Sequence, residues 1–205
     1  MEDVLDLYAE PADPQRPLVC LDELSYQLLG EVSEPLPAAP GRARRRDYEY
    51  TREGTCNLFV AVEPQGGARH VRVTERRTAQ DFAWFMKHLL EVQYAHAEVV
   101  RLVTDNLNTH TPAAFYATFD AATARALTQK LEWHYTPKHG SWLNMAEIEN
   151  SILKRQCLKR RLPDQATVAA EVAAWEAARN AQRATITWSF TTQAARTKLA
   201  RLYEL

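Results

Sequence analysis

The sequence has no long hydrophobic segment and only three cysteines. No apolar run approaches the roughly 18 residues of a membrane-spanning helix, and Met1-Glu2-Asp3 begins the chain without the basic and apolar regions of a signal peptide. The cysteines, Cys20, Cys56 and Cys157, lie far apart and form no C-x-x-C pair. These absences argue against a membrane segment, a disulfide framework and structural zinc, and they indicate reduced thiols inside a cell.

The composition does not depart from that of a globular protein. The 205 residues suit one compact domain, with or without an extension. A chain of this length buries about 70% of its unfolded surface and needs no cross-links to fold. Hydrophobic residues make up 46% and charged residues 25%, which disfavours disorder, collagen and coiled coil.

The net charge is only −1, but it is unevenly distributed along the chain. Residues 1–40 hold nine acidic residues and one basic residue, whereas residues 41–205 hold 17 acidic and 24 basic residues. Such an asymmetry points weakly to a nucleic-acid or protein partner. Basic residues gather in two clusters: Arg42, Arg44, Arg45 and Arg46, and later Lys154, Arg155, Lys159, Arg160 and Arg161.

Hydrophobic periodicity predicts an α/β protein with a mixed sheet. Strands are predicted at residues 18–21, 55–62, 69–74, 99–104 and 131–135. Helices are predicted after Thr78, over 111–130, 144–158 and 165–182, and near 193–202. The early strands would pair as a hairpin, and the later ones would add in parallel through helical crossovers.

Two segments are expected to lie outside this core. Residues 1–17 are acidic and contain three prolines, which is typical of a linker-like lead-in. Residues 34–47 contain Pro35, Pro37, Pro40 and Gly41 and should form an exposed loop that carries the first basic cluster.

Three acidic residues occupy positions that suit metal ligands. Asp22 and Asp105 each follow an apolar strand, and Glu147 lies in the first turn of a predicted helix. Ligands of α/β sheets collect at the ends of strands, and a pair of Mg²⁺ ions needs several carboxylate oxygens. Each position also has an ordinary alternative, because strand-end aspartates form turns or caps and the helix dipole favours an acid in the first turn.

The sequences around these acids closely resemble the catalytic motifs of DDE transposases, above all the IS630 family of the IS630/Tc1/mariner group. In that group an Asp-Asn-x-x-x-His block follows the fourth strand, as Asp105-Asn106-Leu107-Asn108-Thr109-His110 does here. A second block ends in Leu-Asn-x-x-Glu, and Thr136-Pro137-Lys138-His139-Gly140-Ser141-Trp142-Leu143-Asn144-Met145-Ala146-Glu147 is similar to it. The first acid of the group matches Asp22 in Val19-Cys20-Leu21-Asp22-Glu23.

The resemblance covers residues 18–190 and leaves 191–205 as a C-terminal helical tail. It implies an RNase H-like, retroviral integrase-like mixed sheet flanked by helices. It also implies two Mg²⁺ ions, for which Mn²⁺ substitutes, and no covalent protein–DNA intermediate. Asp22, Asp105 and Glu147 would be the metal ligands and catalytic residues of DNA cleavage at transposon ends and strand transfer into target DNA.

Two other acids compete for the proposed ligand positions, and the sequence departs from the family motifs at two points. Glu149 lies two residues after Glu147, about 200° around a helix, so both cannot face one site. Glu23 is the rival of Asp22, and adjacent strand residues face opposite sides. The 41 residues between Asp105 and Glu147 exceed the spacing usual in the mariner branch, and the helical stretch 111–130 should absorb them. Asn150 stands where the family often has an apolar or aromatic residue, which is expected to loosen helix packing.

Residues near the acids are candidates for supporting roles. His110 would orient a phosphate or a carboxylate, or cap the next helix, while Asn144 would act as the N-cap of the Glu147 helix. Asn106 follows Asp105 directly. Candidate DNA contacts are Lys138, His139 and Trp142, together with both basic clusters. The alternatives are a core-anchoring role for Trp142 and an ordinary solvated surface for the clusters.

The implied partners are DNA, as transposon ends and as target, and a second copy of the chain in a homodimer. No membrane partner is expected. A helix-turn-helix recognition domain is expected from a separate or upstream product, since only about 17 residues precede the first catalytic strand. The resemblance places the protein in the bacterial cytoplasm, at the nucleoid. Two other interpretations remain: a remnant that binds or inhibits a full-length transposase, and a stand-alone RNase H-like nuclease.

Overall fold

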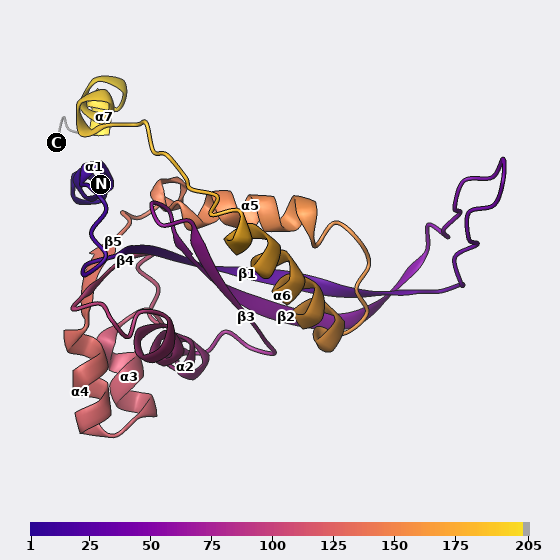
Figure 1. The fold of residues 1–205 in the computed structure, drawn as a ribbon, viewed down its shortest axis with the longest axis horizontal. Coiled ribbons are helices and arrows are strands. Elements are labelled where there is room, and N and C mark those ends of the chain that lie inside the picture. The colour runs from indigo at the N-terminus through magenta and orange to yellow at the C-terminus, as the bar shows by residue number, and fades with distance from the viewer. Residues whose placement is uncertain (203–205) are drawn as a thin grey trace.

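The computed structural model describes residues 1–202, which fold around a five-stranded mixed sheet with the strand order β3-β2-β1-β4-β5 (Figure 1). The strands are β1 (Leu18–Glu31), β2 (Tyr50–Glu63), β3 (Ala68–Thr74), β4 (Val100–Thr104) and β5 (Leu131–Tyr135). β1–β2 and β2–β3 pair antiparallel, whereas β1–β4 and β4–β5 pair parallel. The mixed α/β sheet predicted from the sequence is confirmed.

The first two strands are much longer than predicted. β1 continues past Asp22 to Glu31 because β2 pairs along it from Cys20↔Val62 to Glu31↔Tyr50. The expectation that the first strand ends at Leu21 is therefore wrong. The parallel pairing of β1 with β4, however, stops at Cys20↔Val103. Asp22 thus lies inside a strand but just beyond the part of it that β4 covers.

Helices cover both faces of the sheet (Figure 1). On one face lie α2 (Ala79–His88), a π-helical turn (Leu89–Gln93), α3 (Pro112–Thr118) and α4 (Ala121–Gln129). On the other face lie α5 (Ala146–Gln156) and α6 (Gln165–Ala181). Alternation along β1 separates the two cores: Val19 and Leu21 pack on the α2–α4 side, and Leu24 and Leu28 on the α5–α6 side.

Local sequence explains where these helices begin. Thr78 forms the predicted N-cap, in a reciprocal capping box with Asp81. The predicted helix over 111–130 is interrupted, because Asp120 accepts hydrogen bonds from the backbone N–H groups of Ala122 and Thr123 and starts a new helix. The long interval between Asp105 and Glu147 is thus occupied by α3, α4 and β5.

The expectation that residues 1–17 contribute nothing to the core is wrong for the helix α1 (Glu2–Ala9). Val4, Leu5 and Leu7 are buried, and the hydroxyl of Tyr8 donates a 2.8 Å hydrogen bond to the carbonyl of Leu143. α1 lies beside α7 (Thr192–Lys198), which precedes a short 3-10 turn at Ala200–Leu202 (Figure 1). Apolar burial, not the acidic surface, decides the structure of this segment.

The acidic N-terminal region is neutralised by bases from later in the sequence. Glu2 pairs with Arg196 at 2.7 Å, and Glu10 pairs with the buried Arg101. The Asp3 carboxylate lies 2.9 Å from the ring of His134. The charge asymmetry of the sequence therefore reflects internal pairing in part.

Residues 32–49 connect β1 to β2 as an arm that projects from the body of the protein (Figure 1). Its two sides approach each other through isolated bridges at Leu36↔Arg45 and Ala39↔Arg42. The exposed loop predicted at 34–47 is confirmed. None of the helices within residues 1–202 is both long and apolar enough to cross a membrane.

Candidate active site

Sheet register brings Asp22 and Asp105 to the same edge of the parallel pair. The last paired residues are Cys20 of β1 and Val103 of β4, and each aspartate lies two residues further on. Parallel strands advance together at about 3.3 Å per residue. The two carboxylates therefore emerge at equal height from neighbouring strands, where functional groups of α/β sheets gather.

The Asp22 carboxylate is the most strongly perturbed acid of this edge. Its Oδ1 accepts a 2.8 Å hydrogen bond from the Glu23 backbone, and its Oδ2 accepts a 2.9 Å bond from the Asn150 amide. Burial raises the pKa of Asp22 to about 6, and the negative charges of Glu147 and Asp105 add to the rise. Asp105 and Glu147 thus lie close enough to Asp22 for their charges to act on it.

Glu147 reaches this edge because of the way α5 begins. The helix starts at Ala146 with Met145 as its N-cap residue, one position later than predicted for Asn144. Asn144 is buried and still bonds to backbone: its amide donates to the Leu21 carbonyl at 2.7 Å, and its Oδ1 accepts from the Ala146 N–H at 3.1 Å. It therefore ties the first turn of α5 to β1 directly before Asp22.

The two rival acids are engaged by basic side chains. Glu149 is completely buried and paired with Arg69 at 2.8 Å and Arg179 at 3.2 Å. Glu23 follows the odd-numbered side of β1, which packs on α2–α4, while Asp22 contacts Asn150 of α5 on the other side. This burial and pairing favour Asp22 and Glu147 over Glu23 and Glu149 as the acids that accompany Asp105.

His110 lies between two carboxylates. Its Nδ1 is 2.6 Å from Oδ1 of Asp105, and its Nε2 is 3.0 Å from Oε1 of Glu23. Burial lowers the pKa of His110, but the hydrogen bonds to Asp105 and Glu23 outweigh burial and raise it to about 9. The ring does not cap α3, whose N-cap is Thr111. Three roles are predicted for His110: to orient a phosphate, to orient a carboxylate, or to cap a helix. The structure shows contact with carboxylates.

The donor set of this edge suits divalent cations. Carboxylate oxygens are the ligands that Mg²⁺ and Mn²⁺ prefer. Besides burial, the raised pKa of Asp22 reflects neighbouring negative charge that a cation would neutralise. The buried Oδ1 of Asn150 also has no hydrogen-bond partner among the described residues. Within residues 1–202, no three histidine, cysteine or acidic side chains lie close enough to hold a metal, so binding would require the acids to move closer together.

A pocket of about 380 Å³ adjoins Asp105. It lies between the two motif loops and is lined by Asp105, Asn106, Leu107, Thr136, Pro137, Lys138, His139 and Ser141. The side chains of Lys138 and His139 are exposed there. Trp142 is 48% exposed, with its ring edge-on to Phe190 at 5.7 Å. It is therefore anchored on one side and open on the other.

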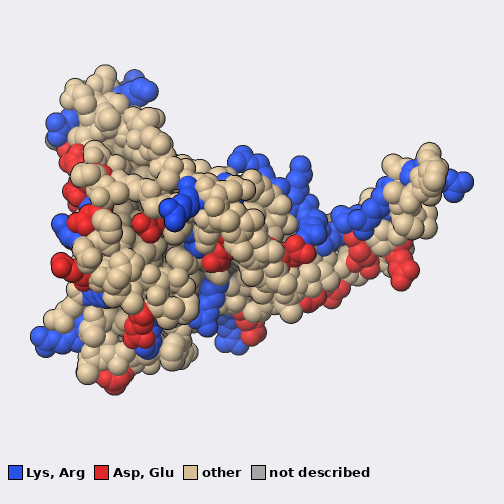
Figure 2. Space-filling model, in the orientation of Figure 1, with Lys and Arg blue, Asp and Glu red and all other residues tan. Residues whose placement is uncertain are grey.

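The two basic clusters have different surroundings. Arg42, Arg44, Arg45 and Arg46 are exposed on the arm (Figure 2), where Arg46 pairs with Glu31 at 3.0 Å. Lys154, Arg155 and Lys159 are exposed at the end of α5 and just beyond it. Arg160 pairs with Glu171 on the surface.

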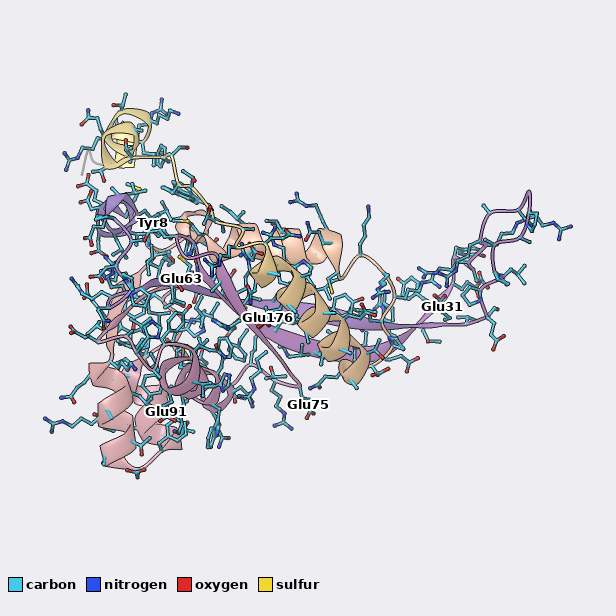
Figure 3. The ribbon with its side chains drawn as sticks, in the orientation of Figure 1. Tyr8, Glu31, Glu63, Glu75, Glu91 and Glu176 are labelled. Carbon is cyan, nitrogen blue, oxygen red and sulfur yellow. The ribbon has the colours of Figure 1, made fainter. Side chains whose placement is uncertain are left out.

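Arg161 does not suit the predicted DNA contact. Its side chain is only 12% exposed and bonds the Glu31 carboxylate and three carbonyls of residues 47–49. Figure 3 shows Glu31 where the arm leaves the body. Arg161 thus anchors the arm, and nothing in the sequence distinguishes it from its basic neighbours.

Sequence reasoning also missed the partners of Asp22 and Glu149. Asn150 and Arg69 reach these acids from distant parts of the chain, so no local spacing indicates them. Only buried polar residues on otherwise apolar faces, such as Asn150 in α5, could have signalled them.

Solved structures show similarity to this fold. The Mos1 mariner paired-end complex with Mn aligns with a TM-score of 0.56 and 16% identity, over 88% of this chain and 55% of that chain. A pre-cleavage Mos1 transpososome aligns with a TM-score of 0.54 and 15% identity, over 88% of this chain and 58% of that chain. The simian T-cell lymphotropic virus intasome in complex with PP2A regulatory subunit B56 gamma aligns with a TM-score of 0.50 and 13% identity. That alignment covers 79% of this chain and 49% of that chain. The predicted RNase H-like fold is thereby confirmed, and the chain spans about half the length of these relatives.

The family is established by sequence. No curated protein matches the chain. Residues 17–169, which include all three converging acids, match the family described as DDE superfamily endonuclease. Since this match covers most of the sequence, the chain belongs to the DDE superfamily endonuclease family.

Proposed function

We propose that this chain is the catalytic domain of a DDE transposase of the IS630 type, which cleaves DNA at transposon ends and joins them to target DNA. The observation that carries the proposal is the convergence of Asp22, Asp105 and Glu147. Burial raises the pKa of Asp22, and the charges of the other two acids raise it further. Acids are seldom gathered in this way unless a site uses them. The family match and the fold shared with transposase complexes support the same reaction class.

Asp22, Asp105 and Glu147 would hold two divalent ions, Mg²⁺ or in its place Mn²⁺. When bound, such ions lower the pKa of a nucleophilic water or 3′-hydroxyl and stabilise the leaving oxygen. The chain's own contribution is to fix the carboxylates: Asn150 bonds Asp22, Asn144 places the start of α5, and His110 bonds Asp105. Asn106 lies beside the pocket, where it would face the substrate.

DNA would approach along exposed basic residues. Lys138 and His139 line the pocket next to Asp105, where phosphate oxygens would pass, and Trp142 offers an open ring face for a base. Lys154, Arg155 and Lys159, with Arg160, would contact the backbone without reading sequence. The arginines of the arm would serve a second DNA segment or a second copy of the chain.

The wider assembly is part of the proposal. The chain would act as a homodimer in the bacterial cytoplasm, at the nucleoid, with a helix-turn-helix recognition domain supplied by a separate or upstream product. A remnant that only inhibits a full-length protein would not need three converging acids. For this reason the catalytic role is preferred.

The test is a cleavage and strand-transfer assay in Mg²⁺ or Mn²⁺, with and without the recognition domain. Asp105→Asn should bind DNA but not nick it, while Asp13→Asn, an exposed residue far from the site, should behave as the wild type. Full nicking by Asp105→Asn would refute the assignment. An active enzyme that cleaves but never joins strands would indicate the stand-alone nuclease instead.

A further inference from the structure

A chain of buried polar groups leads from the interior of the protein to Asp105. Oε1 of Glu23 lies 3.0 Å from Nε2 of His110, and Nδ1 of His110 lies 2.6 Å from Oδ1 of Asp105. The side chains of Glu23 and His110 are 4% and 1% exposed, against 32% for Asp105. Each ring nitrogen thus lies within hydrogen-bond distance of a carboxylate oxygen.

Folding alone does not account for Glu23. The preceding residues on the same side of β1, Val19 and Leu21, are buried apolar side chains in the α2–α4 core. A carboxylate in the next position of this side loses hydration, which an apolar residue would not. Buried ionic groups often add no stability relative to apolar residues of similar volume. Glu23 therefore requires an explanation beyond packing.

The imidazole of His110 is held firmly enough to transmit an orientation. The ring of Phe82 lies against it with a centroid separation of 4.8 Å. The hydroxyl of Tyr135 donates to the His110 carbonyl at 3.0 Å, which fixes the backbone. With Glu23 bound at Nε2, the ring cannot turn without breaking two hydrogen bonds.

Asp105 needs such support because it begins a loop. It follows the last residue of β4 and leads into the exposed residues Asn106, Leu107 and Asn108. His110 engages only Oδ1, and no hydrogen bond from the described residues reaches Oδ2. One carboxylate oxygen is thus fixed and the other is left for a ligand. Hydrogen bonds of this kind to ligating carboxylates typically change metal affinity or activity 10- to 100-fold.

We propose that Glu23 is a positioning residue which, through His110, holds the Asp105 carboxylate in the orientation that binds a divalent cation. The proposal rests on the function proposed above, and it gives Glu23 a role distinct from that of a metal ligand. The second partner of Glu23, Arg77, lies 3.6 Å away and is more than half exposed, so it is not expected to share this role.

Direct Mn²⁺ binding, measured by calorimetry without DNA, provides the test. Glu23→Leu and His110→Phe should bind Mn²⁺ about 10- to 100-fold more weakly than the wild type. Glu23→Gln, whose amide oxygen can still accept from Nε2, should recover most of the affinity. Arg77→Gln and Ser25→Ala, which change an exposed partner and a neighbour on the same strand, should match the wild type.

Two further readouts separate positioning from folding. The Mn²⁺ concentration for half-maximal cleavage should rise in Glu23→Leu, while the rate at saturating Mn²⁺ falls much less. Glu23→Leu leaves Nε2 of His110 without its partner and should unfold at a lower temperature, so Mn²⁺ binding is measured where the variant is still folded. Unchanged Mn²⁺ affinity in both Glu23→Leu and His110→Phe would overturn the proposal. If Asp105→Asn binds Mn²⁺ as well as the wild type does, the proposed metal site itself fails.

Discussion

The side-chain amide of Asn150 donates a 2.9 Å hydrogen bond to Oδ2 of Asp22 and so joins α5 to β1 at the candidate active site. Asn150 is 4% exposed, and its Oδ1 has no hydrogen-bond partner among the described residues. The expectation that asparagine at this position merely loosens helix packing is therefore wrong. The residue makes an orienting contact with the Asp22 carboxylate.

Asn150→Leu should separate stability from activity. Leucine removes the unpaired buried oxygen, so the free energy of unfolding should stay within about 1 kcal/mol of the wild type or rise. The Asp22 carboxylate loses its donor, and DNA cleavage should fall about 10-fold or more. Urea unfolding and a cleavage assay measure the two effects, with the exposed Ser151→Ala as control. Wild-type cleavage by Asn150→Leu would show that the hydrogen bond has no functional role.

Breaking the Arg69–Glu149 pair should lower folding stability, in contrast to Asn150→Leu, which should lower activity. Both side chains are fully buried, and the pair links α5 to β3. Arg69→Met leaves the Glu149 carboxylate with only Arg179, and it should lower the free energy of unfolding by about 3–5 kcal/mol. Arg179→Met should cost less, because Arg179 is 15% exposed and Arg69 remains in place.

The same pair tests the identity of the third acid. Glu149→Gln should weaken folding in urea but leave Mn²⁺ affinity unchanged at temperatures where the protein stays folded. Glu147→Gln should do the reverse, because Glu147 is partly exposed and its charge reaches Asp22. Loss of Mn²⁺ binding in the folded Glu149→Gln protein would return Glu149 to the candidate ligands.

The sequence predicts the acidic residues of the site better than the extent of the strands and helices. Asp105 and Glu147 sit in dense local motifs, and the structure brings them to the same edge as Asp22. Local periodicity could not show that β1 runs on to Glu31, because that length depends on pairing with β2, whose residues lie far along the chain. Nor could the acidic residues 1–17 reveal α1, whose helix is stabilised by packing of Val4 and Leu7 against distant residues.

The supporting contacts of the site were the least predictable part. Glu23 meets His110 across 87 positions of sequence, and Asn150 meets Asp22 across 128. Such pairs follow from the register and from helix docking. Those features are settled only when the whole core is assembled.

His70 predicts a pH dependence of stability away from the site. Burial lowers its pKa to about 4, and the charge of His88 adds to the effect. The ring stands edge-on to Tyr94 at 5.7 Å, and the Glu176 carboxylate of α6 is 4.0 Å away. An unfolded chain protonates this histidine near pH 6.5, whereas the folded protein does so only near pH 4.

The contribution of neutral His70 to the free energy of unfolding should therefore be complete above pH 6.5. It should decrease as the pH falls from 6.5 to 4. The loss of unfolding free energy due to His70 is up to about 3 kcal/mol. An ion pair between the protonated ring and the Glu176 carboxylate would make this loss smaller. His70→Phe keeps the aromatic contact but does not titrate. The difference in unfolding free energy between wild type and His70→Phe should shift in favour of the variant over this range. A constant difference from pH 7 to pH 4 would contradict the prediction.

Arg161 should control how firmly the arm is held to the body. Its guanidinium donates to the carbonyls of Glu49 at 2.8 Å, Asp47 at 2.9 Å and Tyr48 at 3.0 Å, and it pairs with Glu31. It also lies 5.5 Å from the centre of the Tyr50 ring. Arg161→Gln removes most of these contacts at once, so local opening of residues 32–49 should become easier while the sheet stays folded.

Limited trypsin digestion measures this opening at Arg42, Arg44 and Arg45, all of which are exposed. Cleavage in the arm should become several-fold faster in Arg161→Gln, with little change in thermal unfolding of the body. Arg160→Gln is the matched control, because that neighbour is half exposed and pairs with Glu171 instead of the arm. Equal cleavage rates in the two variants would mean that the strands β1 and β2 alone hold the arm, and that Arg161 remains available for another role.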